Sequence, residues 1–224
     1  VREALAGAYL ALGERCGAHD PRVAVRSSAV DEDGRSASFA GQYDTFLNVS
    51  GIDGVIEAVG RCRATLQSER VIEYRRNVGL SAADNIRLAV LVQQLVPSDV
   101  SGVMFTANPV NGNRDEVVIN ASWGLGESIV DGTVTPDTFF VRKSDLAIVS
   151  RHVAENRRMT VSIPGGTDKV EVPKFLRTQA VLDEAQIREM ALLGISLEAR
   201  HGWPVDVECA YHARSLYLLQ CRPI

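Results

Sequence analysis

The sequence lacks the features that mark membrane, secreted and nucleic-acid-binding proteins. It has no run of about 18 uninterrupted apolar residues, the length that crosses a bilayer. Its first residues resemble neither a secretory signal nor a transit peptide. Its formal net charge is -4, and no long block of one sign provides a footprint for nucleic acid or an anionic membrane. We therefore expect a cytoplasmic protein that binds neither nucleic acid nor membrane.

Cysteine and lysine are also scarce, and each shortage excludes a type of site. The four cysteines are scattered without a C-x-x-C pair, which excludes a zinc knuckle or a dithiol redox motif. The chain has three lysines against 21 arginines, and it contains neither a G-x-x-x-x-G-K-[ST] nor a G-x-G-x-x-G motif. Any nucleotide binding must therefore use something other than a P-loop or a Rossmann fingerprint.

The C-terminal residues 204–224 carry the most informative pattern that is present. Two segments of alternating polar and apolar residues flank a break at 211–215, which predicts two antiparallel strands joined by a turn. If Tyr211 pairs with Tyr217, Glu208 lies opposite Gln220 and Asp206 lies opposite Arg222. In that register the alternation places one set of polar side chains on the same face: Asp206, Glu208, Gln220 and Arg222.

Two acids, an amide oxygen and a guanidinium on one face can hold a cation and a phosphate together. Hard divalent cations such as Mg²⁺ take oxygen ligands and are usually shared with substrate phosphates, while arginine forks onto phosphate oxygens. The alternative is a solvent-exposed face with two ion pairs, because charged residues mostly lie on solvated faces. The spacing by itself is compatible with both interpretations.

The rest of the chain predicts a mixture of helices and strands. Helical spacing covers 1–16, 53–77 (one long helix or a broken pair) and 183–200, while strands are expected at 23–26, 43–49, 86–96, 101–106, 116–120 and 136–142. The continuous apolar runs of three of these strands, 86–96, 101–106 and 116–120, suggest that they are buried on both faces. A single α+β architecture of two lobes fits this order better than a doubly wound sheet does.

Several motifs occur in one order along nearly the whole chain. They include Val23-Ala-Val-Arg-Ser-Ser-Ala29, Ala37-Ser-Phe-Ala-Gly-Gln42, Ser101-Gly-Val-Met-Phe-Thr106, Ala121-Ser-Trp-Gly-Leu-Gly-Glu127 and Gln220-Cys-Arg-Pro223. Together they resemble the ATP-binding domain of phosphoenolpyruvate synthases, pyruvate phosphate dikinases and rifampicin phosphotransferases. The stretch Thr106–Arg114 resembles the rifampicin phosphotransferase branch somewhat more than the synthases.

The resemblance implies an α+β, ATP-grasp-like fold, with mixed or antiparallel sheets and flanking helices in two lobes, and it implies ATP and Mg²⁺ as cofactors. Arg26 would contact the ATP phosphates, and the loop ending at Gly41 and Thr45 would close over them, since small residues let backbone amides approach phosphate oxygens. Gln93 would lie near the adenine or the hinge between lobes. Gly41 could instead be an ordinary turn glycine, and Gln93 a hydrogen-bonded core residue.

By the same resemblance, the C-terminal hairpin holds the metal. Glu208 and Gln220 would be metal ligands, Asp206 a further ligand or an orienting group, and Arg222 a phosphate contact. Glu127 would lie at the catalytic rim, with charge complementarity at a helix N-terminus as the alternative explanation. The resemblance thus assigns catalytic roles to Arg26, Arg222 and Glu127.

Two features of the family are missing from these 224 residues. Relatives carry a phosphate-binding lysine well upstream of the motif at 23–26, and they transfer phosphate to a histidine in a separate swivelling domain. We therefore expect residues 1–224 to form a partial ATP-grasp domain, without the lysine-bearing segment and the phosphohistidine domain. The expected function is donation of a phosphoryl or pyrophosphoryl group from Mg·ATP to that histidine, in cis or in trans. The alternatives are a non-catalytic nucleotide-binding module or an ATP-grasp ligase that forms an acyl phosphate.

Overall fold

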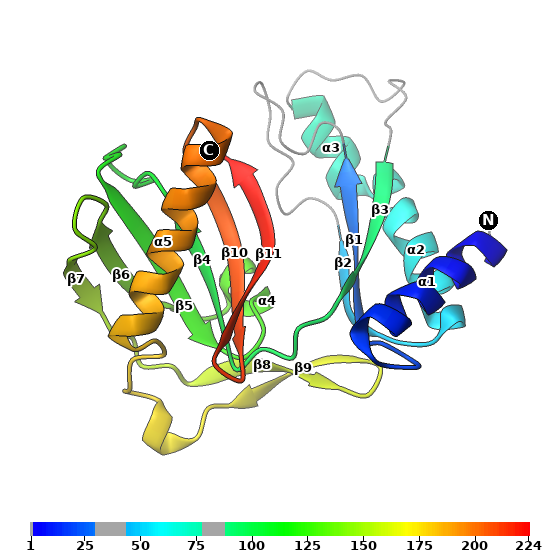
Figure 1. Cartoon of the computed structure of the whole chain (residues 1–224). Coiled ribbons are helices and arrows are strands. Elements are labelled where there is room, and N and C mark those ends of the chain that lie inside the picture. The colour runs from blue at the N-terminus through cyan, green and yellow to red at the C-terminus, as the bar shows by residue number, and fades with distance from the viewer. Residues whose placement is uncertain (1, 30–43, 78–87) are drawn as a thin grey trace. The chain divides into compact units, whose positions relative to one another are not determined.

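The structure, a computed structural model, describes residues 2–29, 44–77 and 88–224 (Figure 1). It divides into two compact units. The N-terminal unit comprises Val1–Leu95 and Ser162–Thr167, and the C-terminal unit comprises Val96–Val161 and Asp168–Ile224. No helix among the described residues is long and apolar enough to cross a membrane.

The N-terminal unit is built on a three-stranded antiparallel sheet in the order β2-β1-β3. Its strands are β1 (Val23–Ala29), β2 (Thr45–Val49) and β3 (Leu88–Gln94), and its helices are α1 (Arg2–Cys16), α2 (Ile52–Ala64), η1 (Thr65–Gln67) and α3 (Glu69–Asn77). Helices α1 and α2 lie on one side of the sheet (Figure 1), where Val23 and Val25 pack against Tyr9 and Val55. The helical pattern at 53–77 is therefore a broken pair.

The outer strand β3 differs from its prediction. Its continuous apolar run suggested burial on both faces, but Leu91 is 48% exposed. On the face toward the helices, Val90 and Val92 pack against the core. An antiparallel sheet needs only one buried face, so an apolar run does not require two.

One residue of β2 joins this sheet to another part of the chain. Asn48 has a positive φ of 57°, and the register between β1 and β2 shifts at this point. Its side-chain amide donates hydrogen bonds to the carbonyl oxygens of Ile163 and Gly166, the latter at 2.9 Å. The tip of a later hairpin is thereby anchored within the N-terminal unit.

The C-terminal unit is built on a six-stranded antiparallel sheet in the order β11-β10-β4-β5-β6-β7. Its strands are β4 (Val100–Phe105), β5 (Glu116–Trp123), β6 (Asp137–Arg142), β7 (Ile148–His152), β10 (Val205–His212) and β11 (Ser215–Pro223). The chain also forms α4 (Glu127–Val130), the separate hairpin of β8 (Arg158–Ile163) and β9 (Gly166–Glu171), η2 (Lys174–Leu176) and α5 (Glu184–His201). Strands β4 and β5 pair antiparallel as neighbours in the chain and so form a local hairpin.

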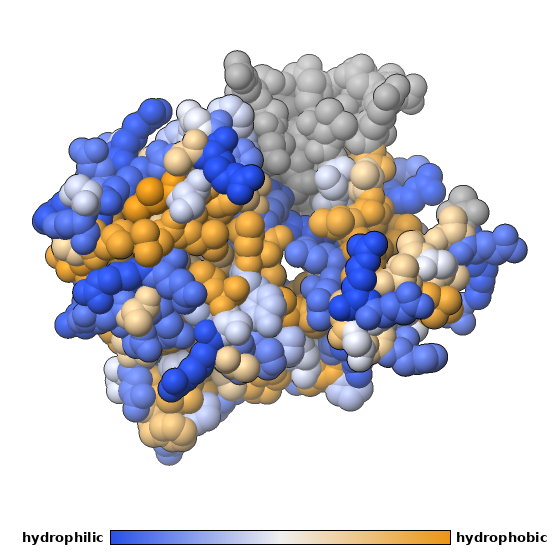
Figure 2. All heavy atoms as spheres, viewed as in Figure 1, coloured by the Kyte–Doolittle hydropathy of each residue, from blue (hydrophilic) through white to orange (hydrophobic). Residues whose placement is uncertain are grey.

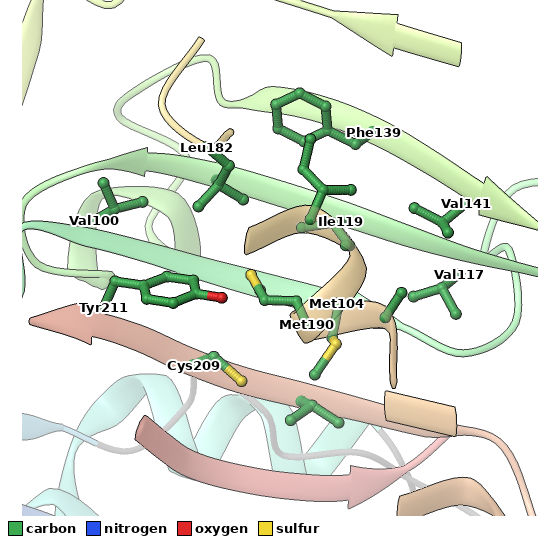
Figure 3. Packing of buried hydrophobic residues seen from close by; sticks show 14 of the residues in the cluster. Val100, Met104, Val117, Ile119, Phe139, Val141, Leu182, Met190, Cys209 and Tyr211 are labelled. Atoms are coloured by element: carbon green, nitrogen blue, oxygen red, sulfur yellow. The ribbon is translucent and has the colours of Figure 1, made fainter. Parts of the chain in front are cut away.

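Helix α5 covers one face of this sheet. It begins at an Asp183–Gln186 capping box and ends at Gly202, whose φ of 78° suits a left-handed cap. Its Met190 lies among Met104 and other buried side chains of the sheet (Figure 3). A Cβ at Gly102 would lie 2.8 Å from the Met190 terminal methyl, so a larger residue there would require the methionine side chain to shift.

The opposite face of the six-stranded sheet is more polar. Asn120 and Thr138 occupy it, joined by a 2.9 Å hydrogen bond from the threonine hydroxyl to the amide oxygen. Hydrophilic and hydrophobic residues are interspersed on the surface of both units in the view of Figure 2. The apolar core of this unit lies between the sheet and α5.

Candidate functional site

The C-terminal hairpin forms as expected, but its turn is tighter than expected. His212 pairs with Ser215, which leaves only Ala213 and Arg214 in the loop. Both have positive φ, 48° and 67°, the conformation of a two-residue type I′ turn. This turn pairs Tyr211 with Leu216, so the predicted pairing of Tyr211 with Tyr217 is wrong.

A β-bulge corrects the register before the polar residues are reached. Cys209 pairs with Leu218, but Glu208 pairs with Gln220, so Leu219 is an extra residue on β11. Beyond the bulge Asp206 lies opposite Arg222. Both predicted pairs, Glu208 with Gln220 and Asp206 with Arg222, are therefore present. The register from which they were predicted applies only to the part of the hairpin beyond the bulge, away from the turn.

The four polar side chains share the face of the sheet that α5 does not cover. Val205, Val207 and Cys209 point toward α5 and are buried in its core. Because successive side chains alternate, Asp206 and Glu208 point to the other face, and their cross-strand partners accompany them. All four of the polar residues are partly exposed.

The hairpin residues Asp206, Glu208 and Gln220 carry side-chain oxygens, the ligand atoms that Mg²⁺ takes. The side-chain oxygen Oε1 of Gln220 is buried, and no described residue donates a hydrogen bond to it. Leaving such an acceptor unsatisfied costs about 1–3 kcal/mol, and a cation or its bound water would remove that cost. The described residues contain no group of three or more His, Cys, Asp or Glu that could hold a metal ion by themselves. An amide oxygen as the third ligand beside Asp206 and Glu208 is consistent with that finding.

Two cysteines flank this set without adding soft ligands to it. Burial, followed by the negative charge of Glu208, raises the pKa of Cys209 to about 12. Burial and then the charge of Asp206 likewise raise the pKa of Cys221. These thiols therefore stay protonated near neutral pH, and a protonated thiol is a poor metal ligand.

Three other residues that were predicted to contact ATP lie on one sheet of the N-terminal unit. Arg26 lies opposite Thr45 on β2 and Leu91 on β3, and Gln93 follows two residues along β3. Since Val25 points toward the helices, Arg26, Thr45 and Gln93 share the face that points away from them. Gly41 lies outside the described residues.

Glu127 is the first residue of α4 in the C-terminal unit and is partly exposed. The helix follows β5, whose last residue Trp123 pairs with Val100, and Val100 in turn pairs with Tyr211. Glu127 therefore follows the end of the sheet that lies beside the hairpin turn, whereas Asp206 belongs to the other end. The strand register does not group it with the four hairpin residues.

Sequence reasoning missed the bulge at Leu219, although the signal is visible. The run Leu216-Tyr-Leu-Leu219 contains two consecutive leucines, which breaks the alternation of a regular strand.

The sequence reasoning also missed a buried carboxylate, Asp137, which is 0% exposed. It accepts hydrogen bonds from the backbone amides of Ala154 and Val181, both at 2.9 Å, and so fixes loops around β6.

The α+β fold of antiparallel sheets with flanking helices is ATP-grasp-like. The pyruvate phosphate dikinase AMP/ATP-binding domain is the family whose sequence model matches, over residues 1–224. The chain belongs to this family, and the predicted resemblance is confirmed.

Similar proteins cover the whole chain. A probable phosphoenolpyruvate synthase of Methanocaldococcus jannaschii is 45% identical over 225 residues, covering 100% of this chain and 19% of the relative. The phosphoenolpyruvate synthase of Pyrococcus furiosus is 44% identical over 233 residues, covering 100% of this chain and 28% of the relative. The rifampicin phosphotransferase of Streptomyces sviceus is 41% identical over 225 residues, covering 100% and 26%. Whole-chain similarity does not favour the rifampicin phosphotransferase branch, and the chain spans between 19% and 28% of the length of these relatives.

Proposed function

We propose that the chain binds Mg·ATP and donates its phosphoryl or pyrophosphoryl group to a histidine on a separate swivelling domain, in cis or in trans. The observation that carries the proposal is the pairing of Glu208 with Gln220, whose buried side-chain oxygen accepts no hydrogen bond from a described residue. Membership of an AMP/ATP-binding family supports the choice of nucleotide.

In this proposal the hairpin holds the metal and one end of the triphosphate. Glu208 and Gln220 would bind Mg²⁺, with Asp206 as a further ligand or an orienting group. The ion supplies positive charge that neutralises the phosphate oxygens, the main requirement of phosphoryl transfer. Arg222, opposite Asp206, would donate hydrogen bonds to the same phosphates.

The residues of the N-terminal unit would complete the nucleotide contacts. Arg26 would bind phosphate oxygens, and so would Thr45, which lies opposite it on β2, together with Gly41. Gln93, on the same face, would lie near the adenine or the hinge between the lobes. Glu127 would act at the rim, where a carboxylate can orient a charged group.

Calorimetric titration of the chain with ATP, in the presence and absence of Mg²⁺, tests the proposal. We expect Mg²⁺-dependent binding that Glu208→Ala weakens at least about tenfold, because a charged ligand is lost. Glu155→Ala is the matched control, since Glu155 is an exposed carboxylate of the same unit. Circular dichroism would verify that both variants are folded. Equal Mg²⁺-dependent affinity in wild type and Glu208→Ala would refute the assigned role.

The transfer step needs a second measurement. ATP labelled at the β- or γ-phosphate would be mixed with this chain and the histidine-bearing domain of a similar phosphoenolpyruvate synthase. Acid-labile label on that domain is the expected result, since phosphohistidine hydrolyses in acid. Formation of ADP and an acyl phosphate in place of a labelled histidine would favour the ligase alternative.

A further inference from the structure

A cavity of about 300 Å³ lies within the C-terminal unit, apart from the residues assigned to ATP. Its walls come from α4 and the segment after it and from β8 and β9. The polar side chains that line it are Ser128, Thr133, Arg158, Thr160 and Lys169. None of them belongs to the nucleotide or metal set proposed above.

The most informative of these residues is Thr160. It is 1% exposed, and its hydroxyl oxygen is buried without a hydrogen-bond partner among the described residues. The backbone holds it there, because the amide of Leu125 donates to the Thr160 carbonyl at 2.9 Å and Gly124 pairs with the same residue. Thr160 lines the cavity, and its hydroxyl is a donor that no described residue uses.

The charges around the cavity favour an anion. The Lys169 ammonium donates to an Asp131 carboxylate oxygen and to the Thr133 hydroxyl, each at 3.1 Å, which fixes it at the wall. An ammonium has three protons, so one remains for a ligand. The Arg158 side chain makes no hydrogen bond or ion pair with the described residues and adds a second positive charge. The two cations therefore outweigh the carboxylate of Asp131.

We propose that this cavity binds a phosphate group, as inorganic phosphate or as a small phosphomonoester. Arg158 presents a fork of donors, Lys169 a point charge and Thr160 a hydroxyl, and tetrahedral oxyanions are recognised by such a combination. A volume of about 300 Å³ lies at the lower end of small-molecule sites, which suits a phosphate better than a whole nucleoside triphosphate.

The test is a calorimetric titration of the chain with inorganic phosphate and, separately, with glycerol phosphate. We expect saturable binding that Arg158→Gln weakens at least about tenfold, because a charge-assisted contact is lost. Arg151→Gln is the matched control, since Arg151 is an exposed arginine on neighbouring β7 that does not line the cavity. Tighter binding of one of the two probes would identify the source of the phosphate group.

A second pair of variants tests the buried hydroxyl. Thr160→Val keeps the shape of the side chain and removes the donor, so phosphate affinity should fall, whereas Thr160→Ser should retain it. Loss of affinity in both variants, or in neither, would contradict a ligand contact through this hydroxyl.

Arg222→Gln separates this proposal from the proposed nucleotide site. If phosphate affinity persists in this variant, the result would support phosphate binding in the cavity. If affinity disappears, phosphate binds at the hairpin instead, and the inference is overturned. Absence of saturable phosphate binding would also overturn it, and so would equal binding by Arg158→Gln and Arg151→Gln. None of these outcomes depends on whether Glu208 is needed for Mg·ATP.

Discussion

Glu208 on β10 lies directly opposite Gln220 on β11 because Leu219 is accommodated as a bulge. Counted from the turn at Ala213 and Arg214 without a bulge, the residue opposite Glu208 would be Leu219. The extra residue moves the next one into its place, so the amide faces the carboxylate. Bulges often lie beside functional sites, where they direct a side chain.

Changes in the length of β11 should show whether Mg·ATP affinity depends on the register of the two strands or only on which residues they contain. Inserting alanine between Leu219 and Gln220 should turn Gln220 and Arg222 toward the face packed against α5. An unpaired charge in that core costs about 3–5 kcal/mol, so both folding stability and Mg·ATP affinity should fall. Deleting Leu219 removes the bulge and still leaves Gln220 as the residue opposite Glu208, so affinity should stay within about threefold of wild type.

Calorimetry with Mg·ATP and urea unfolding of both variants provide the measurements. Leu219→Ala is the control, because it trims the side chain and keeps the chain length. An insertion variant that binds Mg·ATP as wild type does would contradict the importance of the register.

Replacing Gln220 with methionine should have opposite effects on stability and binding. Gln220→Met keeps the approximate shape and removes the buried oxygen that has no donor among the described residues. Relief of an unsatisfied acceptor should leave the free energy of unfolding unchanged or raise it by about 1 kcal/mol, while Mg²⁺-dependent ATP affinity falls at least about tenfold.

Urea unfolding and calorimetry would measure the two quantities on the same samples. Gln179→Met, at an exposed position of the same unit, is the matched control. If Gln220→Met lowered stability and left ATP affinity unchanged, the oxygen would have a structural role instead of a ligand role.

Gly124 and Gly132 should differ in their tolerance of alanine. Both have positive φ, 77° and 69°, but a Cβ at Gly124 would lie 2.3 Å from the Thr160 carbonyl oxygen, whereas Gly132 has open space. Gly132→Ala should therefore cost about 1 kcal/mol of backbone strain. Gly124→Ala adds a clash with backbone and should cost at least about 3 kcal/mol in the free energy of unfolding.

Urea unfolding of the two variants under identical conditions measures these losses of stability. Similar losses in the two variants would mean that backbone strain alone, without the clash at Gly124, accounts for them. A shift of the Thr160 backbone in Gly124→Ala should also lower phosphate affinity at the cavity, because Thr160 lines it.

The N-terminal unit should lose stability at alkaline pH through Tyr9. Its hydroxyl donates to Asp20 at 2.6 Å, and the Gly51 amide donates to both the hydroxyl and the carboxylate. Burial, followed by the hydrogen bond to Asp20, raises the pKa of Tyr9 from 10.0 to about 12. A raised pKa favours the folded state fully below the unfolded value of 10.0, and this contribution is lost as pH rises through about 12.

Urea unfolding of wild type and Tyr9→Phe, measured below pH 10 and near pH 12, isolates this group. The difference in stability between the two proteins should shrink as pH rises, since phenylalanine does not titrate. A constant difference over that window would exclude ionisation of Tyr9 as a source of the pH dependence.

The sequence by itself determined the family, the α+β class and the positions of most helices and strands. These depend on local patterns: the period of apolar residues, the Asp183 cap and Gly202 stop of α5, and the alternation along β10. It also identified the polar members of the hairpin, because alternation decides which residues share a face. The cross-strand partners of Asp206 and Glu208 follow once the offset, that is the register between β10 and β11, is known.

Only the tertiary structure decided that offset and the surroundings of the site. The turn fixes the register at one end of the hairpin, and the bulge at Leu219 changes it before the other end. The two consecutive leucines break the alternation, but they do not fix how the two strands pair. The exposed Leu91 and the buried Thr160 likewise depend on which element packs against each strand. Burial and register are set by contacts between distant segments, so they are properties of the folded chain and not of its local sequence.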